Sequence, residues 1–87
     1  MDLLTLGKII NTHGLDGTLV VFSTTDFASI RYKKDKKLII LNPYNKETKI
    51  CTVVSYRNYK GNDYVKFLEI NSIDEAIVIS SWNEYSL

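Results

Sequence analysis

The sequence is poor in the residues that build covalent and metal-bound scaffolds. Its 87 residues include one cysteine, one histidine, one proline and only four glycines. The lone Cys51 excludes an internal disulfide and indicates a reducing compartment, with a buried structural thiol as the simplest expectation. One histidine and one cysteine at distant positions also fall short of the roughly three or four ligands of a zinc site. We expect neither a disulfide scaffold nor a metal.

The N-terminal segment lacks the features of a targeting or membrane sequence. The stretch MDLLTLGKII has no basic leader, carries Asp2 and is interrupted by Lys8. Such a stretch resembles neither a signal peptide nor a membrane span. We therefore expect a cytoplasmic protein without membrane contact. It should form a single domain, because 87 residues suffice for one modest core.

Catalytic patterns are missing as well. His13 is the only residue of the type suited to acid–base work at neutral pH, and no serine lies in a Gly-x-Ser-x-Gly elbow. The segment GLDG at residues 14–17 is not a phosphate-binding loop, because it lacks the Gly-Lys-Ser/Thr ending and leads into an apolar, strand-like run. The sequence predicts no enzyme and no cofactor.

The formal net charge of +1 conceals an uneven distribution of charge. Ten Lys or Arg and three acidic residues lie from Arg31 to Lys66, whereas four acidic residues and no basic one follow Lys66. Such asymmetry is informative about partners. The run has two interpretations, a solvated turn that protects a strand edge and a contact with RNA or an acidic protein. Its densest part contains five basic residues, Arg31, Lys33, Lys34, Lys36 and Lys37.

Most of the chain has the pattern of short strands. Runs rich in β-branched residues indicate strands at residues 19–22, 38–41 and 50–54, and alternation predicts another at 64–68. Turn residues separate these runs at 16–17, 42–43 and 60–63. Strands at this spacing predict an all-β antiparallel sandwich or small barrel. We favour the closed barrel, because closure removes exposed edges.

Two short segments have helical features. Ser72 and Glu75 match a capping box, in which each side chain accepts a backbone N–H of the other residue. The following residues 76–79 are β-branched enough to need packing against the rest of the domain. Residues 25–30 can hold one or two helical turns, with Thr25 or Asp26 as the cap.

The only histidine stands at the start of a predicted turn. Gly14, Asp16 and Gly17 fit a structural turn, because glycine tolerates positive φ and aspartate can bond its own backbone. We favour a structural role for His13, with its ring hydrogen-bonded to neighbouring backbone. The alternative is a surface contact with a partner, since exposed loop residues often serve binding.

A second group of residues alternates aromatic and cationic side chains. Stacking platforms for single-stranded nucleic acid combine these two kinds of side chain. The alternative function for the chain is therefore a free-standing single-stranded RNA-binding β-barrel. The residues that would form its platform are Tyr56, Arg57, Tyr59, Lys60 and Tyr64.

Five segments together resemble the N-terminal domain of the RimM ribosome maturation factor family. The resemblance implies a six-stranded β-barrel like the second domain of translation elongation factors, and no catalysis. The segment Thr-His-Gly-x-x-Gly is the most specific of them. The segments are GKI at residues 7–9, THGLDG at 12–17, TDF at 25–27, SYR at 55–57 with Lys60 and Gly61, and NSIDEA at 71–76.

The same resemblance implies a function in late maturation of the small ribosomal subunit. It implies binding to a ribosomal protein of the subunit head and help in processing the small-subunit rRNA, with possible direct contact to that RNA. We expect a monomer in which basic residues supply attraction and loops supply specificity. The candidate partner-binding residues are His13, Arg31, Lys33, Lys34, Lys36, Lys37, Arg57 and Lys60.

The sequence departs from the family pattern in three places. RimM-like chains continue into a second, PRC-type barrel, and this sequence stops at Leu87, so we expect residues 1–87 to be one RimM N-terminal-like domain without the downstream barrel. The family often has glycine near Ser81, where this chain has two serines. Residues 68–71 (LEIN) also replace a stretch that often carries glycine. These changes affect local turns more than the fold.

Overall fold

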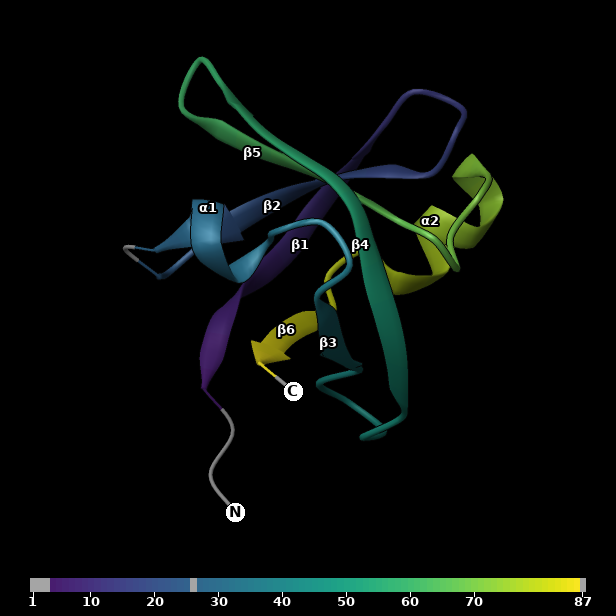
Figure 1. Cartoon of the computed structure of the whole chain (residues 1–87). Helices are drawn as coiled ribbons and strands as arrows, with labels where there is room; N and C mark the ends of the chain where they lie inside the picture. Colours follow the sequence, from purple (N-terminus) through teal and green to yellow (C-terminus); the bar gives the residue numbers. More distant parts are fainter. Residues whose placement is uncertain (1–3, 26, 87) are drawn as a thin grey trace.

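The computed structural model describes residues 4–25 and 27–86 (Figure 1). Its elements are β1 (Thr5–His13), β2 (Thr18–Ser23), α1 (Ala28–Arg31), β3 (Lys37–Leu41), β4 (Thr48–Tyr59), β5 (Asn62–Phe67), α2 (Ile73–Ile79) and β6 (Asn83–Ser86). The strands form one closed barrel in the order β1-β2-β5-β4-β3-β6, with antiparallel neighbours. The expectation of a closed six-stranded antiparallel barrel with short helices is confirmed.

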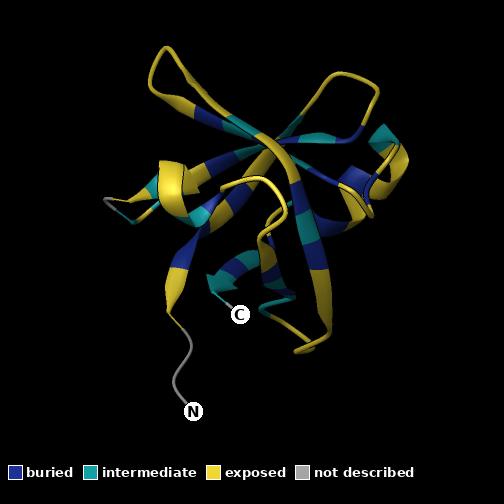
Figure 2. Ribbon diagram, in the orientation of Figure 1, coloured by how far each residue is buried: buried dark blue, intermediate teal, exposed yellow. Residues whose placement is uncertain are grey.

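Alternation along the strands sends apolar side chains into the barrel. Val65 and Phe67 of β5 are fully buried, and the lysine between them is not. Figure 2 shows this contrast, with buried segments on the barrel strands and exposed residues at the hairpin tips. Cys51 is buried as expected, and burial raises the pKa of its thiol to about 11, so the thiol is unreactive at neutral pH. The core consists of Leu6, Ile9, Leu19, Val21, Tyr32, Leu38, Ile40, Cys51, Val53, Val65, Phe67, Ile70, Ala76, Ile79 and Trp82.

Strands β1 and β6, which close the barrel against each other, have weak sequence signals. In β1 the register against β2 shifts between Ile9 and Asn11, so the exposed Ile10 breaks the alternation. Strand β6 is only four residues long, Asn-Glu-Tyr-Ser, and contains no β-branched residue. Pattern analysis of the residues therefore did not mark either segment as a strand.

Helix α2 forms as the capping pattern predicts. The Ser72 hydroxyl accepts the Glu75 backbone N–H at 3.2 Å. The Glu75 carboxylate reaches back one residue farther than expected, to the backbone N–H of Asn71 at 3.2 Å. Ala76 and Ile79 are buried, and the helix packs mainly against β1 and β2. The barrel thus supplies the packing that this β-branched helix needs.

Several predicted boundaries require correction, most of all the strand predicted at 50–54, which extends from Thr48 to Tyr59 as β4. Helix α1 begins at Ala28, because the Thr25 hydroxyl accepts the N–H of Phe27 before the helix instead of capping it; Asp26 lies outside the described residues. Strand β5 ends at Phe67, one residue early, since Leu68 turns away toward α2. The turn predicted at 60–63 contracts to residues 60–61, because Asn62 already pairs with β4.

The barrel interior also contains a chain of polar side chains. The Tyr32 hydroxyl donates to Glu84 Oε1 at 2.6 Å, and the Tyr32 ring stacks on Tyr56 at a centroid distance of 5.5 Å. The Tyr56 hydroxyl donates to Asp63 Oδ1 at 2.7 Å. Burial raises the pKa of Glu84 to about 7, the charge of Asp63 adds to this rise, and the Tyr32 hydrogen bond opposes it. The sequence patterns did not predict this group. The one available signal was the alternation at the end of the chain, which places Glu84 on the same inward face as Trp82.

Candidate interaction surface

The β1–β2 turn at residues 14–17 is built to hold one conformation. Gly14 and Gly17 have φ of 76° and 90°, so the expectation of positive φ here is confirmed. A Cβ on Gly17 would lie 2.7 Å from the Ile70 carbonyl oxygen. Asp16 Oδ1 accepts the Thr18 N–H at 3.0 Å and the Thr18 hydroxyl at 2.8 Å, and these bonds lower the pKa of Asp16.

His13 ends β1 directly before this turn, paired with Thr18. Its ring lies edge-on against the Tyr64 ring, with a centroid distance of 4.9 Å and an interplanar angle of 65°. Among the described residues the imidazole forms no hydrogen bond, so the predicted bond to neighbouring backbone is wrong. Packing replaces it, because β5 brings Tyr64 alongside the end of β1 through β2. His13 is nevertheless exposed and accessible to a partner.

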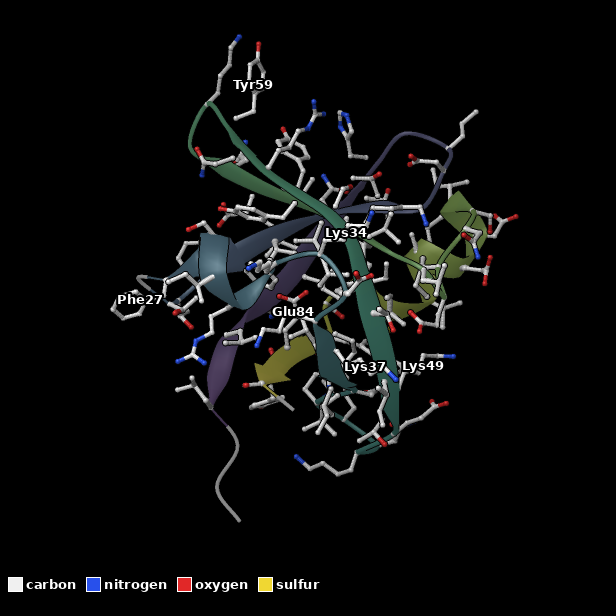
Figure 3. All side chains as sticks on the ribbon, in the orientation of Figure 1. Phe27, Lys34, Lys37, Lys49, Tyr59 and Glu84 are labelled. Carbon is white, nitrogen blue, oxygen red and sulfur yellow. The ribbon has the colours of Figure 1, made fainter. Side chains whose placement is uncertain are left out.

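The β4–β5 hairpin adds cations and aromatic rings to this end of the barrel. The Arg57 guanidinium carbon lies 5.1 Å from the Tyr64 ring centroid, and Lys60 Nζ lies 5.3 Å from the Tyr59 centroid. Tyr59 is 55% exposed, and Figure 3 shows it at the hairpin tip, pointing away from the barrel. We call these residues the hairpin-end surface; they are His13, Arg57, Tyr59, Lys60 and Tyr64.

A cleft of about 350 Å³ lies at the base of this surface. Its walls carry an ionised carboxylate from Asp16, the Arg57 guanidinium and the Tyr64 ring. Such a mixture suits a planar polar group or an extended charged chain more than an apolar ligand. The remaining lining residues are Thr18, Ser55 and Tyr56.

Tyr56 differs from the other residues expected to form a stacking platform. Its hydroxyl donates to Asp63 and its ring stacks on the buried Tyr32, so this half-buried side chain packs against the core and exposes only the part that lines the cleft. Burial, the hydrogen bond to Asp63 and the charge of Asp63 raise the pKa of Tyr56 to about 12. The structure therefore turns four of the five platform residues toward the outer face of the sheet and the fifth, Tyr56, toward the barrel core.

The basic run forms a separate group from the hairpin-end surface. Arg31 ends α1, and the lysines that follow are exposed in the loop before β3 and at its first residue, Lys37. Backbone hydrogen bonds of 2.8 Å join Asp35 and Lys36 of this loop to Val53 of β4. Figure 3 places Lys34 and Lys37 over the barrel body, well away from Tyr59. The candidate partner-binding residues thus form two groups and not one continuous patch.

The described residues contain neither a metal-binding cluster nor a helix that could span a membrane. Within residues 4–25 and 27–86, no three His, Cys, Asp or Glu side chains gather in a way that could hold a metal ion. In the same part of the chain, no helix has the length and apolar character required to cross a bilayer.

Comparison with known sequences identifies the family. The profile described as the RimM N-terminal domain matches residues 4–83. The ribosome maturation factor RimM of Streptococcus pneumoniae serotype 4 is 36% identical over 87 residues, which cover all of this chain and 49% of that protein. The RimM of Bacillus pumilus is 45% identical over 73 residues, or 84% of this chain and 42% of that protein. The chain therefore spans about half the length of the curated relatives it matches.

A solved structure supports the same assignment at the level of the fold. The crystal structure of a 16S ribosomal RNA processing protein, RimM of Pseudomonas aeruginosa, superposes with a TM-score of 0.83 at 20% sequence identity. The match covers 99% of this chain and 51% of the other. With the family profile matching residues 4–83, and relatives 36% and 45% identical over the aligned residues, the chain belongs to the RimM family and corresponds to its N-terminal domain.

Proposed function

We propose that this chain is a non-enzymatic binding domain that acts in the cytoplasm during late maturation of the small ribosomal subunit. It binds the assembling subunit as a monomer, recognises a ribosomal protein of the subunit head and contributes to processing of the small-subunit rRNA. The observation that carries this proposal is the match of the RimM N-terminal domain profile to residues 4–83. The relatives named ribosome maturation factor and the neighbour named for 16S rRNA processing support it.

The geometry supports the hairpin-end surface as the contact with the subunit. It gathers exposed or half-buried rings and exposed cations on two projecting hairpins, the type of surface that binds anionic and planar partners. The basic run before β3, which we call the lysine loop (Lys33, Lys34, Lys36 and Lys37), supplies a second, separate positive region. This region favours approach to RNA-rich surroundings. Contact through the hairpins and attraction through the loop are compatible roles.

A matched pair of charge reversals tests this proposal. Lys60 and Lys46 are both exposed turn lysines with positive φ, 51° and 64°, but Lys60 lies at the hairpin tip and Lys46 in the turn between β3 and β4. Association with assembling small subunits is measured by pull-down with the tagged chain. We expect Lys60→Glu to weaken association about fivefold or more at low salt, and Lys46→Glu to have little effect. Added salt should reduce the difference, because exposed charges are screened over about 8–10 Å.

The possible outcomes of this pull-down test two claims separately: that the hairpin tip is the contact, and that the chain binds the assembling subunit at all. Equal loss in both variants would assign the effect to net charge and remove the hairpin tip as the contact. No association of the unmodified chain with assembling subunits would contradict the proposed function itself. Binding to purified head proteins in the absence of rRNA, measured with the same tagged chain, identifies the protein partner.

The cation–ring pairs Tyr59–Lys60 and Tyr64–Arg57 favour a second candidate, a free-standing single-stranded RNA-binding module. A stacking platform loses roughly 1–3 kcal/mol of binding free energy for each aromatic removed. Micromolar binding of short oligonucleotides that falls with Tyr59→Ala would favour this candidate. We expect no such binding above background from the chain alone.

A further inference from the structure

The lower half of β4, residues 48–52, has a neighbouring strand on one side only. On the β3 side, the Val53 N–H donates to the Lys36 carbonyl and the Val53 carbonyl accepts from Asp35, both at 2.8 Å. Alternate residues of an antiparallel strand direct their N–H and C=O groups to the same side, so Cys51 also faces β3. On the other side, β5 pairs with β4 only from Val53 to Tyr59 and ends at Phe67.

The first position of the uncovered edge is closed by the turn that follows β5. The Leu68 N–H donates to the Thr52 carbonyl at 2.8 Å, and the Glu69 carboxylate accepts the Thr52 N–H at 2.6 Å. Glu69 also accepts the Thr52 hydroxyl at 2.9 Å. By alternation, Ile50 presents its N–H and C=O groups on this same side, where the described part of the chain provides no strand. An open sheet edge therefore begins directly below Glu69.

A cleft of about 320 Å³ runs along this edge. Ile50, Ile70 and Val78 line it with apolar surface, and Val78 is 63% exposed on α2. Figure 1 shows α2 and the lower part of β4 on the same side of the barrel. The cleft thus combines unpaired strand groups with apolar side-chain sites, which are the two elements of strand-addition recognition.

The charges along the cleft indicate the chemistry of its occupant. Glu69 and Glu75 contribute two carboxylates against the single ammonium of Lys49. Burial raises the pKa of Glu69, but the hydrogen bonds from Thr52 and the charge of Lys37 outweigh it and lower the pKa, so this carboxylate is ionised at neutral pH. Asp74 lies beside Glu75 in the first turn of α2 and adds a third carboxylate, and the charge of Lys37, the first residue of β3, acts on Glu69, so three carboxylates stand against two ammonium groups. The excess of negative charge is complementary to a basic segment.

We propose that this edge binds an extended, basic segment of a protein partner, which adds to β4 as an extra strand. The segment lies beside β4 where β5 no longer does, beyond Leu68. Its backbone pairs with Ile50, and its alternate apolar side chains contact Val78. Helix α2 and the turn at residues 69–70 wall the edge, so the cleft admits a single strand more readily than the sheet of a second barrel. This surface is distinct from the hairpin-end surface, and the inference does not depend on the proposed function.

A synthetic peptide tests the inference directly. The probe is an acetylated, amidated hexapeptide in which valine and lysine alternate, titrated into the 15N-labelled chain. We expect amide shifts centred on Ile50 and its neighbours. Replacing one central valine of the probe with proline should abolish them, because proline cannot complete a strand pairing.

Two helix variants provide a matched comparison on the protein. Val78→Lys and Ile77→Lys add the same charge at adjacent exposed positions of α2, but only Val78 lines the cleft. We expect Val78→Lys to weaken peptide binding about tenfold and Ile77→Lys to change it less than about twofold. Ile50→Pro removes only the outward N–H and should also weaken binding, with thermal unfolding as the check on its fold.

Several outcomes would overturn the inference. One is amide shifts confined to the hairpin-end surface, and another is equal loss of binding in the two helix variants. A concentration-dependent dimer that forms without peptide binding, seen by sedimentation, would assign the edge to a second copy of the chain. None of these outcomes depends on whether the chain associates with the small subunit. The inference can therefore fail while the proposed function stands, and the reverse.

Discussion

The two hairpins that project at one end of the barrel are built in opposite ways (Figure 1). The β1–β2 turn is tied to the rest of the molecule, because the Leu15 carbonyl accepts the Ile73 N–H at 3.1 Å and Gly17 lies directly against the Ile70 backbone. The β4–β5 hairpin ends in Lys60 and Gly61, and a Cβ on Gly61 would meet nothing within 4 Å.

This difference indicates how a small barrel can divide its work. The fixed turn joins β1 and β2 to the start of α2 and so helps to define the fold. The free hairpin exposes Tyr59 and Lys60, whose side chains contact each other at the hairpin tip. Loops that carry binding residues on a rigid scaffold are common, and here the rigid and the exposed roles belong to neighbouring hairpins.

The largest expected effect comes from placing the same side chain in both turns. Gly17 and Gly61 have nearly equal φ, 90° and 81°, so valine is strained in both, but only Gly17 is crowded. We expect Gly17→Val to lower the free energy of unfolding by roughly 3–5 kcal/mol, and Gly61→Val by about 1–2 kcal/mol. Denaturant unfolding of both variants measures the difference. Equal losses would show that the β1–β2 turn is no more fixed than the free hairpin.

The next effect concerns the barrel that supports both hairpins. Glu84 is fully buried with a pKa of about 7, above its ordinary value of 4.5, so the folded state keeps a proton that the unfolded chain loses between these values. The contribution of Glu84 to the unfolding free energy should be complete below about pH 4.5, fall as the pH rises to about 7 and level off above it, a loss of about 3 kcal/mol.

Glu84→Gln provides the control for this pH dependence. The glutamine cannot ionise, so its unfolding free energy should lack the fall between acid and neutral pH, whatever its absolute value. The absolute value is less informative, because Glu84 Oε2 has no hydrogen-bond partner among the described residues and a buried amide there costs about 1–3 kcal/mol. Parallel pH profiles for the two proteins would refute the assignment to Glu84. The two hairpins should therefore be compared at a single pH.

A smaller effect is expected at Ser81, on the chain that returns from α2 to the barrel. Ser81 has φ of 82°, at the place where the family resemblance leads one to expect glycine. We expect Ser81→Gly to raise the unfolding free energy by about 0.5–1 kcal/mol, because a left-handed residue without Cβ is unstrained. Ser80→Gly is the matched control: Ser80 has φ of −61°, so glycine there should be neutral or destabilising. The reverse order of the two variants would contradict this explanation.

Sequence reasoning succeeded where one local pattern controls the structure. The alternation in β5, the cap at Ser72 and the glycines of the β1–β2 turn each depend on neighbouring residues, and the structure has them as expected. Strand β1 was missed because its register shift hides the alternation. Strand spacing already favoured a closed barrel, but only the family resemblance gave its number of strands as six.

The candidate site was less predictable, because its members meet through pairing between distant strands. The contact between His13 and Tyr64 depends on the position of β5 beside β2, which no local signal encodes. The inward position of Tyr56 depends on Tyr32, which follows α1. Charge counting likewise grouped Arg57 with the lysine loop, although the fold places them apart.

The smallest effect on stability is expected at His13, where the two hairpins touch. Because the ring is exposed and contacts Tyr64 only by its edge, His13→Ala should lower the unfolding free energy by about 0.5 kcal/mol or less. If His13 is part of the contact with the subunit, association in the pull-down should fall while the melting temperature stays nearly constant. Tyr64→Phe is the companion control, because it keeps the ring against which His13 packs. A His13→Ala variant with full association would limit the hairpin-end surface to the β4–β5 hairpin and leave the β1–β2 turn a purely structural role.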